Sequence, residues 1–331
     1  MAVIDFDKLF SSFAGIKVAV IGDVMLDSYM WGKVERISPE APVPIVSLQK
    51  KEYRIGGAGN VALNLRSLQA NVSVLSVIGN DDDGAVLKKL FGENNINTEF
   101  LLTSSNRITT NKTRIISRNQ QMMRLDSEVT NDLGYEDENR LILAMQQFIA
   151  QEKPQVVIFE DYNKGVITEL VIQKTTGLCK HHNIITTVDP KRKNFFSYTG
   201  VDIFKPNLKE VKEGLNVLED GVGDELLNQI HRQLKEKLQH HISFITLSEH
   251  GVFYADDKNH HIIPSHLRNI ADVSGAGDTV IAVASLVYAA TKDVSLMAEV
   301  ANIAGGLVCE EVGTAAINKE KLLAECRQLI K

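Results

Sequence analysis

Cysteine is scarce in this sequence. The chain has only Cys179, Cys309 and Cys326, which are far apart and lack the CxxC or cysteine/histidine spacing of metal ligands. A disulfide framework needs several paired cysteines, and a structural zinc site needs clustered ligands. The pattern therefore argues against both and favours the reducing environment of the cytoplasm.

Long apolar runs and an excess of basic residues are also missing. The longest apolar stretch, residues 280–290, is well short of the roughly 20 residues that a membrane helix needs. Asp5, Asp7 and Lys8 precede the first apolar run, unlike the basic start of a secretory signal. The formal net charge is -6, so no broad basic surface is expected for a nucleic-acid backbone. We expect a soluble, cytoplasmic protein with neither membrane nor nucleic acid as a partner.

What the sequence does contain is an alternation of short apolar runs with segments of helical period. Hydrophobic residues make up 44% and charged residues 24%, as in globular proteins. Such alternation predicts an α/β fold with a mainly parallel sheet covered by helices on both faces. Strands are expected at 17–21, 72–78, 156–159, 184–188 and 244–247, with helices at 58–68, 84–93, 168–181, from about 207 and at 224–239, then a hairpin near 256–259 and three final helices.

Two stretches interrupt this alternation. Residues 29–53 and 98–125 show the polar alternation of strands without intervening helices. We expect them to leave the main sheet and form a small β-sheet lid, from about 28–55 and 98–126; the alternative is a pair of surface loops. With no repeat and no linker, a single domain over 1–331 plus this lid is the predicted organisation.

The segment 272–279, DVSGAGDT, carries the strongest chemical signal. Gly275, Ala276 and Gly277 precede an apolar helix, where small residues let backbone amides approach an anion and the helix dipole favours negative charge. Asp278 is suited to take a proton from an attacking alcohol rather than to touch phosphate. Together they predict phosphoryl transfer, and the alternative is an aspartate capping a helix after a glycine-rich turn.

A second glycine-rich segment, 56–62, also opens a predicted helix. Gly56 and Gly57 permit close approach of a ligand, and the Asn60 amide can both donate to and accept from sugar hydroxyls. Residues 57–62 also match the dinucleotide pattern GxGxxA. That pattern should follow a buried strand, whereas the preceding residues 50–54 are highly charged, which favours the sugar site.

These two segments, in this order, resemble the two signatures of the ribokinase-like carbohydrate kinases, the PfkB family. The resemblance covers essentially the whole chain and implies ATP and Mg²⁺ as cofactors. It places a sugar-binding aspartate at Asp27, with Asp23 as a second candidate. It also implies that Asn207 and Glu210, in an Asn-x-x-Glu motif, position magnesium and phosphate largely through water.

The resemblance extends to the nucleotide side. Thr246, Ser248 and Gly251 match the family's nucleotide loop, and the adenine pocket is expected within 302–313, beginning at Asn302. Ser248 stands where glycine is commoner, and Val283 where the second signature usually has alanine or glycine. Both departures add side-chain volume and put the details of nucleotide packing in question.

Four stretches, 22–27, 36–44, 117–121 with 124–126, and 272–281, resemble D-glycero-D-manno-heptose 7-phosphate kinases of lipopolysaccharide synthesis. That similarity implies phosphorylation of the anomeric hydroxyl to the 1,7-bisphosphate, in the pathway to ADP-heptose. Such a substrate needs a second positive site, with candidates Arg118, Arg124, Lys164, Lys191 and Arg192.

The alternatives are a kinase for another sugar or nucleoside, and a non-catalytic sugar-binding sensor on the same fold. The chain ends soon after its last predicted helix and has no HxGH motif, so a single activity is expected. Exposed lid strands would also leave open sheet edges, which a homodimer formed through the lid would protect.

Overall fold

The computed structural model describes residues 4–118, 120–219 and 221–330. Its main element is a sheet of nine strands in the order β13-β12-β11-β10-β9-β8-β1-β4-β5, parallel except at β12 and β13. This confirms the predicted α/β class. The strands are β1 (Lys17–Gly22), β4 (Asn71–Gly79), β5 (Leu101–Ser104), β8 (Val156–Glu160), β9 (Ile185–Asp189), β10 (Ile203–Phe204), β11 (Ile242–Thr246), β12 (Val252–Ala255) and β13 (His260–Ile263).

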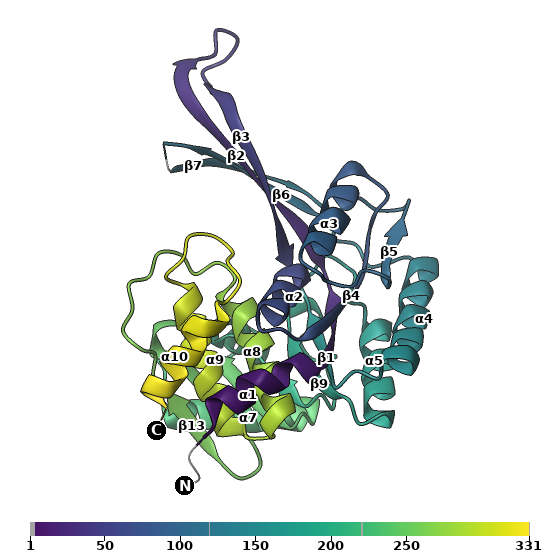
Figure 1. Ribbon diagram of the computed structural model, residues 1–331, viewed down its shortest axis with the longest axis vertical. Coiled ribbons are helices and arrows are strands. Elements are labelled where there is room, and N and C mark those ends of the chain that lie inside the picture. Colours follow the sequence, from purple (N-terminus) through teal and green to yellow (C-terminus); the bar gives the residue numbers. More distant parts are fainter. Residues whose placement is uncertain (1–3, 119, 220, 331) are drawn as a thin grey trace.

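Helices cover both faces of this sheet (Figure 1). Along β1, Val18 and Val20 pack into one apolar core while Ala19 and Ile21 pack into another, as expected for a strand buried on both faces. The first core includes α1 (Phe6–Ser12), α2 (Ala58–Ser67), α3 (Asp82–Glu93), α8 (Ala276–Thr291), α9 (Val294–Val308) and α10 (Lys319–Leu329). The second includes α4 (Tyr135–Glu152), α5 (Glu169–His181), α6 (Leu208–Leu215) and α7 (Asp224–Leu238).

A second, four-stranded sheet has the order β3-β2-β6-β7. Its strands are β2 (Val24–Ile37), β3 (Pro44–Gly57), β6 (Asn111–Ser117) and β7 (Gln120–Ser127). In Figure 1 the β2–β3 hairpin extends well away from the main sheet. We call this second sheet the lid. It matches the predicted stretches except at 98–110, because β5 pairs in parallel with β4 and so belongs to the main sheet.

None of the helices in the described ranges combines the length and hydrophobicity that crossing a bilayer requires.

Candidate active site

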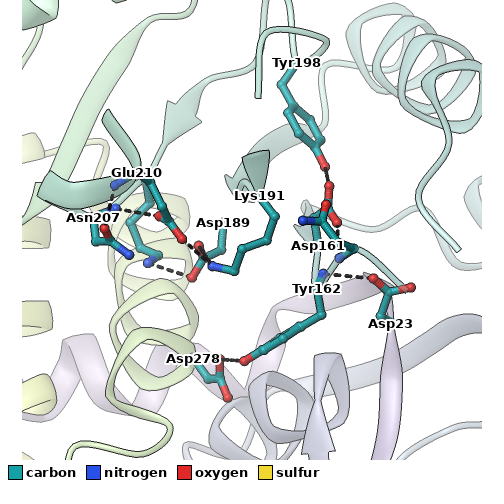
Figure 2. Close-up of polar contacts among 11 residues, drawn as sticks. Asp23, Asp161, Tyr162, Asp189, Lys191, Tyr198, Asn207, Glu210 and Asp278 are labelled. Carbon is teal, nitrogen blue, oxygen red and sulfur yellow. Dashed lines mark hydrogen bonds and ion pairs between the residues drawn. The ribbon is translucent and has the colours of Figure 1, made fainter. Parts of the chain in front are cut away.

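The parallel strands of the main sheet end along one edge, and polar residues gather there. Asp23 follows β1, Tyr162 lies two residues after β8, and Lys191 lies two residues after β9. The start of α8 brings Asp278 to the same place (Figure 2). Open α/β sheets bind their ligands at the carboxyl ends of the strands, so this edge is the candidate active site.

Asp278 is held by two hydrogen bonds and is only 4% exposed. Its Oδ2 accepts from Asn60 Nδ2 at 2.7 Å, and its Oδ1 accepts from the Tyr162 hydroxyl at 2.7 Å. Asn60 lies in the first turn of α2, so this contact joins the two glycine-rich segments identified in the sequence. Asn60 Oδ1 is buried and has no hydrogen-bond partner within the described residues. An unsatisfied acceptor therefore lies beside the carboxylate.

The electrostatic surroundings of Asp278 suit a general base. Burial raises its pKa to about 6, while the hydrogen bonds from Asn60 and Tyr162 oppose that rise. Asp189 raises the pKa further and Lys205 lowers it. The carboxyl group is therefore mainly ionised at neutral pH, yet basic enough to accept a proton efficiently.

The turn before α8 leaves room for an anion. Gly275 has a φ of +80°, and a Cβ there would lie 2.7 Å from Asn60 Nδ2. A Cβ at Gly277 would lie 3.5 Å from Asp189 Oδ2 and 3.7 Å from Lys205 Nζ, which are paired with each other. The amides of Gly275, Ala276 and Gly277 thus lie at a helix N-terminus close to a buried ammonium group, a combination that favours phosphate.

A chain of ion pairs extends from this turn. Lys205, which is 2% exposed, contacts Asp189 Oδ2 at 2.7 Å. Lys191 contacts Asp189 Oδ1 at 3.4 Å and Glu210 Oε1 at 2.7 Å. Although burial opposes it, these two carboxylates raise the pKa of Lys191. Lys205 had no motif to mark it in the sequence.

Asn207 and Glu210 form the capping box of α6. The Asn207 side chain accepts from the Glu210 backbone N–H, and Glu210 Oε2 accepts from the Asn207 N–H at 2.8 Å. Oxygen atoms of this kind are the ligands that Mg²⁺ prefers. Because both side chains already form hydrogen bonds within the cap, contact with Mg²⁺ through water fits them better than direct ligation. No cluster of three potential metal ligands occurs among the described residues.

Of the other predicted nucleotide residues, Thr246 lies beside this cap. Thr246 ends β11 and bridges to Asn207. Ser248 has a φ of +56°, a backbone conformation that favours glycine and explains why glycine is the commoner residue at this place. Gly251 also has a positive φ, of +92°. Asn302 instead donates from Nδ2 to the Pro264 carbonyl, so its side chain stabilises the segment that follows β13.

The two predicted sugar-binding aspartates have different surroundings. Asp27 on β2 is paired with Arg114 on β6, with 2.6 Å between Asp27 Oδ1 and the guanidinium. A Cβ at Gly56 would lie 2.3 Å from Asp27 Oδ2, and one at Gly57 would lie 2.3 Å from the Asp23 carbonyl, so both glycines permit close packing. Arg114 was not predicted, because only the pairing of β2 with β6 reveals that it faces Asp27.

Asp23 supports the loop that follows β8. Its carboxylate accepts the backbone N–H groups of Tyr162 at 2.8 Å, Lys164 at 3.0 Å and Val166 at 3.0 Å. With these three bonds, its oxygens are occupied by the chain itself. Asp23 therefore shapes the 162–166 loop, and the contacts with Arg114 distinguish Asp27 as the carboxylate on the lid side of the site.

The cations predicted for a second phosphate are not all brought together. Arg118 lies in the exposed turn between β6 and β7, and Arg124 is half-exposed and paired with Asp126. Arg192 is exposed in a short 3₁₀ helix after β9. Lys164, by contrast, lies in the 162–166 loop and contacts Glu128 at 2.7 Å.

Lys112, which the sequence did not single out, joins Lys164 in the structure. Burial lowers the pKa of Lys112, and among the charges that act on it Asp27 raises the pKa while Lys164 lowers it. Its ammonium lies 5.6 Å from the centroid of the Tyr162 ring, and the Lys191 ammonium lies 5.7 Å from the same centroid. Lys112 and Lys191 thus flank Tyr162, and Lys164 lies close enough to Lys112 to affect its pKa. We call these three residues the lysine cluster.

Glu160, the last residue of β8, was also missed by the sequence analysis. It is fully buried, and neither carboxyl oxygen has a hydrogen-bond partner within the described part of the chain. Burial, with Asp189 and Asp278 nearby, raises its pKa well above the ordinary value. Glu160 is therefore a buried carboxyl group near Asp278 in which the protonated form is favoured.

A buried aspartate, a glycine turn at a helix N-terminus and nearby lysines together suit the transfer of a phosphoryl group. The match to the model of the pfkB family carbohydrate kinases spans residues 16–321. The chain belongs to this family, whose members transfer a phosphoryl group from ATP to a sugar. The sequence-based assignment to this class of enzyme is confirmed.

Two similar proteins are both named bifunctional protein HldE. The one from Geobacter sulfurreducens is 36% identical over 320 residues, which cover 96% of this chain and 64% of the relative. The one from Aliarcobacter butzleri is 38% identical over 309 residues, which cover 92% of this chain and 63% of the relative. The chain therefore spans somewhat less than two thirds of the length of these relatives.

Solved structures with the same fold are more distant in sequence. Phosphofructokinase-2 from Escherichia coli, crystallised with potassium, has a TM-score of 0.77 at 16% identity, covering 94% of this chain and 99% of the other. Ribokinase from Arabidopsis thaliana, complexed with ribose and ATP, has a TM-score of 0.71 at 14% identity, covering 93% and 98%. These likenesses establish the ribokinase-like fold.

Proposed function

We propose that this enzyme phosphorylates the anomeric hydroxyl of D-glycero-D-manno-heptose 7-phosphate, producing the 1,7-bisphosphate and ADP. The observation that carries the chemistry is the buried Asp278 carboxylate at the start of α8, close to a turn suited to phosphate. The choice of sugar rests on the resemblance of four sequence stretches to heptose 7-phosphate kinases and on the HldE relatives. The three buried, free cysteines are consistent with a cytoplasmic enzyme.

The proposed reaction is a direct in-line transfer. Asp278 accepts the proton of the sugar hydroxyl, and the sugar oxygen forms a bond to the γ-phosphorus of ATP as the bond to ADP breaks. The amides of Gly275, Ala276 and Gly277 meet the charge that develops on the transferred group, each such donor contributing about 3–4 kcal/mol in comparable sites. Mg²⁺, held through water near Asn207 and Glu210, would supply further neutralisation of the phosphates.

The sugar is proposed to lie between α2 and the lid. The free Oδ1 of Asn60 can accept a hydrogen bond from a sugar hydroxyl beside Asp278. Asp27 lies on the lid strand β2 and faces the same region, so its carboxylate can accept a second hydrogen bond from the sugar. A kinase-coupled ADP-release assay with heptose 7-phosphate, fructose 6-phosphate and ribose tests this proposal. If heptose 7-phosphate is not preferred over the other sugars, the assignment of the substrate fails.

The lysine cluster is the proposed site of the substrate's existing phosphate. Burial and the nearby charge of Lys164 lower the pKa of Lys112, so an anion bound between the two ammonium groups would relieve their repulsion. Lys191 faces the same tyrosine ring as Lys112 but is engaged by two carboxylates, Asp189 and Glu210, whereas Lys164 is paired with one, Glu128 at 2.7 Å. We therefore assign the second phosphate mainly to Lys112 and Lys164, and replace the earlier candidates Arg118 and Arg124 with Lys112.

Replacing Lys112 or Lys164 with alanine is expected to raise the KM for a phosphorylated sugar by roughly 10-fold, the value of one charge-assisted hydrogen bond. The KM for the unphosphorylated analogue should change much less, because that sugar has no phosphate group to contact the lysine. Steady-state kinetics with the two sugars measure the difference. Arg124→Ala is the comparison variant: it removes a nearby lid cation that is already paired with Asp126, and should leave both KM values nearly unchanged.

The lid is proposed to join two copies of this chain. Every residue of β7 is exposed, and β7 is an edge strand of its sheet. Long exposed edges are prone to pair with another strand, and apolar side chains favour such burial. Exposed apolar residues on or beside the lid strands are Ile37, Val43, Leu48, Met122, Met123 and Leu125.

Replacing Leu125 with aspartate is therefore expected to convert a dimer to a monomer, because it places a charge in the proposed interface. Light scattering coupled to size-exclusion chromatography at micromolar concentration measures the mass. Leu143→Asp is a matched control, since Leu143 on α4 is 57% exposed and Leu125 is 52% exposed. A wild-type chain that elutes as a monomer would rule out the proposed dimer.

A further inference from the structure

The side chain of Tyr162 lies against Asp278, the proposed catalytic base. Its hydroxyl donates to Asp278 Oδ1 at 2.7 Å (Figure 2). We propose that Tyr162 is a gate: in the sugar-free enzyme its hydroxyl takes the position of the acceptor hydroxyl, and the sugar displaces it on binding. This inference rests on the proposed role of Asp278 as base.

The chemistry of the contact supports substitution of one hydroxyl by another. A phenol O–H and a sugar O–H are equivalent donors to a carboxylate. Burial, with Asp278 and Glu160 nearby, raises the pKa of Tyr162 well above its ordinary value, so the phenol keeps its proton. Tyr162 therefore satisfies the base without competing as an acceptor for the phosphoryl group.

The burial of Asp278 supports displacement rather than addition. The residue is only 4% exposed, and its Oδ2 is engaged by Asn60. The remaining oxygen, Oδ1, is covered by the Tyr162 hydroxyl. A sugar hydroxyl that is to lose its proton to Asp278 must approach this oxygen, and Tyr162 fills that approach.

The attachment of Tyr162 suits a side chain that moves on a fixed backbone. Its N–H is bound to Asp23 Oδ2 at 2.8 Å, so the loop stays in place. The ring is flanked by the ammonium groups of Lys112 and Lys191, and cation–π contacts of this kind are weak. A substrate phosphate attracts Lys112 more strongly than the ring does. Binding of an anionic sugar thereby weakens the hold on the gate.

The gate limits the hydrolysis of ATP by water when no sugar is bound. With Tyr162 in place, the base holds a phenol that keeps its proton, so Asp278 cannot activate a water molecule for attack on ATP. With the sugar bound, the only hydroxyl at the base is the correct nucleophile. The structure thus links use of the base to the presence of substrate.

Replacing Tyr162 with phenylalanine tests the gate through its pH profile. Loss of a hydrogen bond to a charged acceptor should raise the pKa of Asp278 by about one unit in the free enzyme. The acid limb of kcat/KM, which reports the free enzyme, should therefore move to higher pH by about one unit. The acid limb of kcat, which reports the sugar complex, should not move, because the sugar has already displaced Tyr162.

The charged or titratable groups around Asp278 remain unchanged in this variant. They are Glu160 on β8, Asp189 at the end of β9 and Lys205 after β10, with the neutral amide of Asn60 from α2. Sugar-independent ATP hydrolysis should also rise several-fold. Equal shifts of both acid limbs would overturn the gate and make Tyr162 a permanent positioning residue, and no shift in either limb would also overturn it.

Tyr198→Phe is the matched control. Tyr198 is also buried and donates its hydroxyl to a carboxylate, Asp161 Oδ2 at 2.9 Å, which still receives a bond from Asn194. The variant should shift neither limb. The base itself is tested separately with Asp278→Asn. If that variant retains turnover, the proposed function fails; if it loses turnover while Tyr162→Phe leaves both limbs in place, only the gate fails.

Discussion

Replacing Asp278 with asparagine is expected to lower kcat by at least ~100-fold, the smaller end of the range for loss of a general base. Asparagine is nearly the same size and can still bond to Asn60 and Tyr162, but it cannot accept the proton of the sugar hydroxyl. Sugar binding should persist, since the other proposed contacts are unchanged. ADP release at saturating ATP and sugar measures the loss, and turnover near the wild-type value would eliminate Asp278 as the base.

The stability of this variant provides the control for folding. Burial raises the pKa of Asp278 to about 6 from an ordinary value of 3.8. The unfolded chain therefore releases this proton at lower pH than the folded one, and the wild type loses stability as pH rises through that interval. Asparagine has no such dependence. Asp278→Asn should be at least as stable as the wild type at pH 8 in thermal unfolding, so lost turnover would not reflect lost structure.

Replacing Lys205 with methionine is expected to lower the free energy of unfolding by about 3–5 kcal/mol, as when one partner of a buried ion pair is removed. Lys205 is 2% exposed and contacts Asp189 at 2.7 Å. Without it, Asp189 retains only the longer contact to Lys191 and stays buried near Glu160. Urea denaturation at pH 7.5 measures the difference between the variant and the wild type.

The double variant Lys205→Met with Asp189→Asn separates the charge effect from packing. Neutralising Asp189 removes the uncompensated carboxylate, so the double variant should recover much of the lost stability. Lys321→Met serves as the surface control: its contact with Glu310 is half-exposed, and such pairs contribute about 1 kcal/mol or less. A loss of under ~1 kcal/mol in Lys205→Met would contradict the proposed balance of buried charges.

The parts of the fold and site that depend on short stretches of sequence could be predicted from the sequence. The alternation of strands and helices predicted the sheet and its covering, and the two glycine-rich segments identified Asn60 and Asp278, which the structure joins by a hydrogen bond. The errors were also local. The four residues of β5 are too short for a periodic pattern to show which sheet they join, and the helix at Tyr135–Glu152 was overlooked despite regularly spaced apolar residues.

The residues that were missed share a different property: their roles arise from pairing between distant elements. Arg114 faces Asp27 because β6 pairs in parallel with β2. Lys205 meets Asp189 because β10 lies beside β9, and Tyr162 reaches Asp278 from the end of β8. Lysine, arginine and tyrosine are common surface residues, so none is distinctive until the order of strands is known.

The contact between Asn60 and Asp278 joins positions 218 residues apart. During synthesis Asn60 leaves the ribosome long before α8, so the proposed site can be assembled only after residue 278 has been made and α8 has docked against α2. If Asp278 is the base, as proposed, a chain that ends before residue 278 should not phosphorylate sugar. Activity should then require the docking of two segments that are made at very different times.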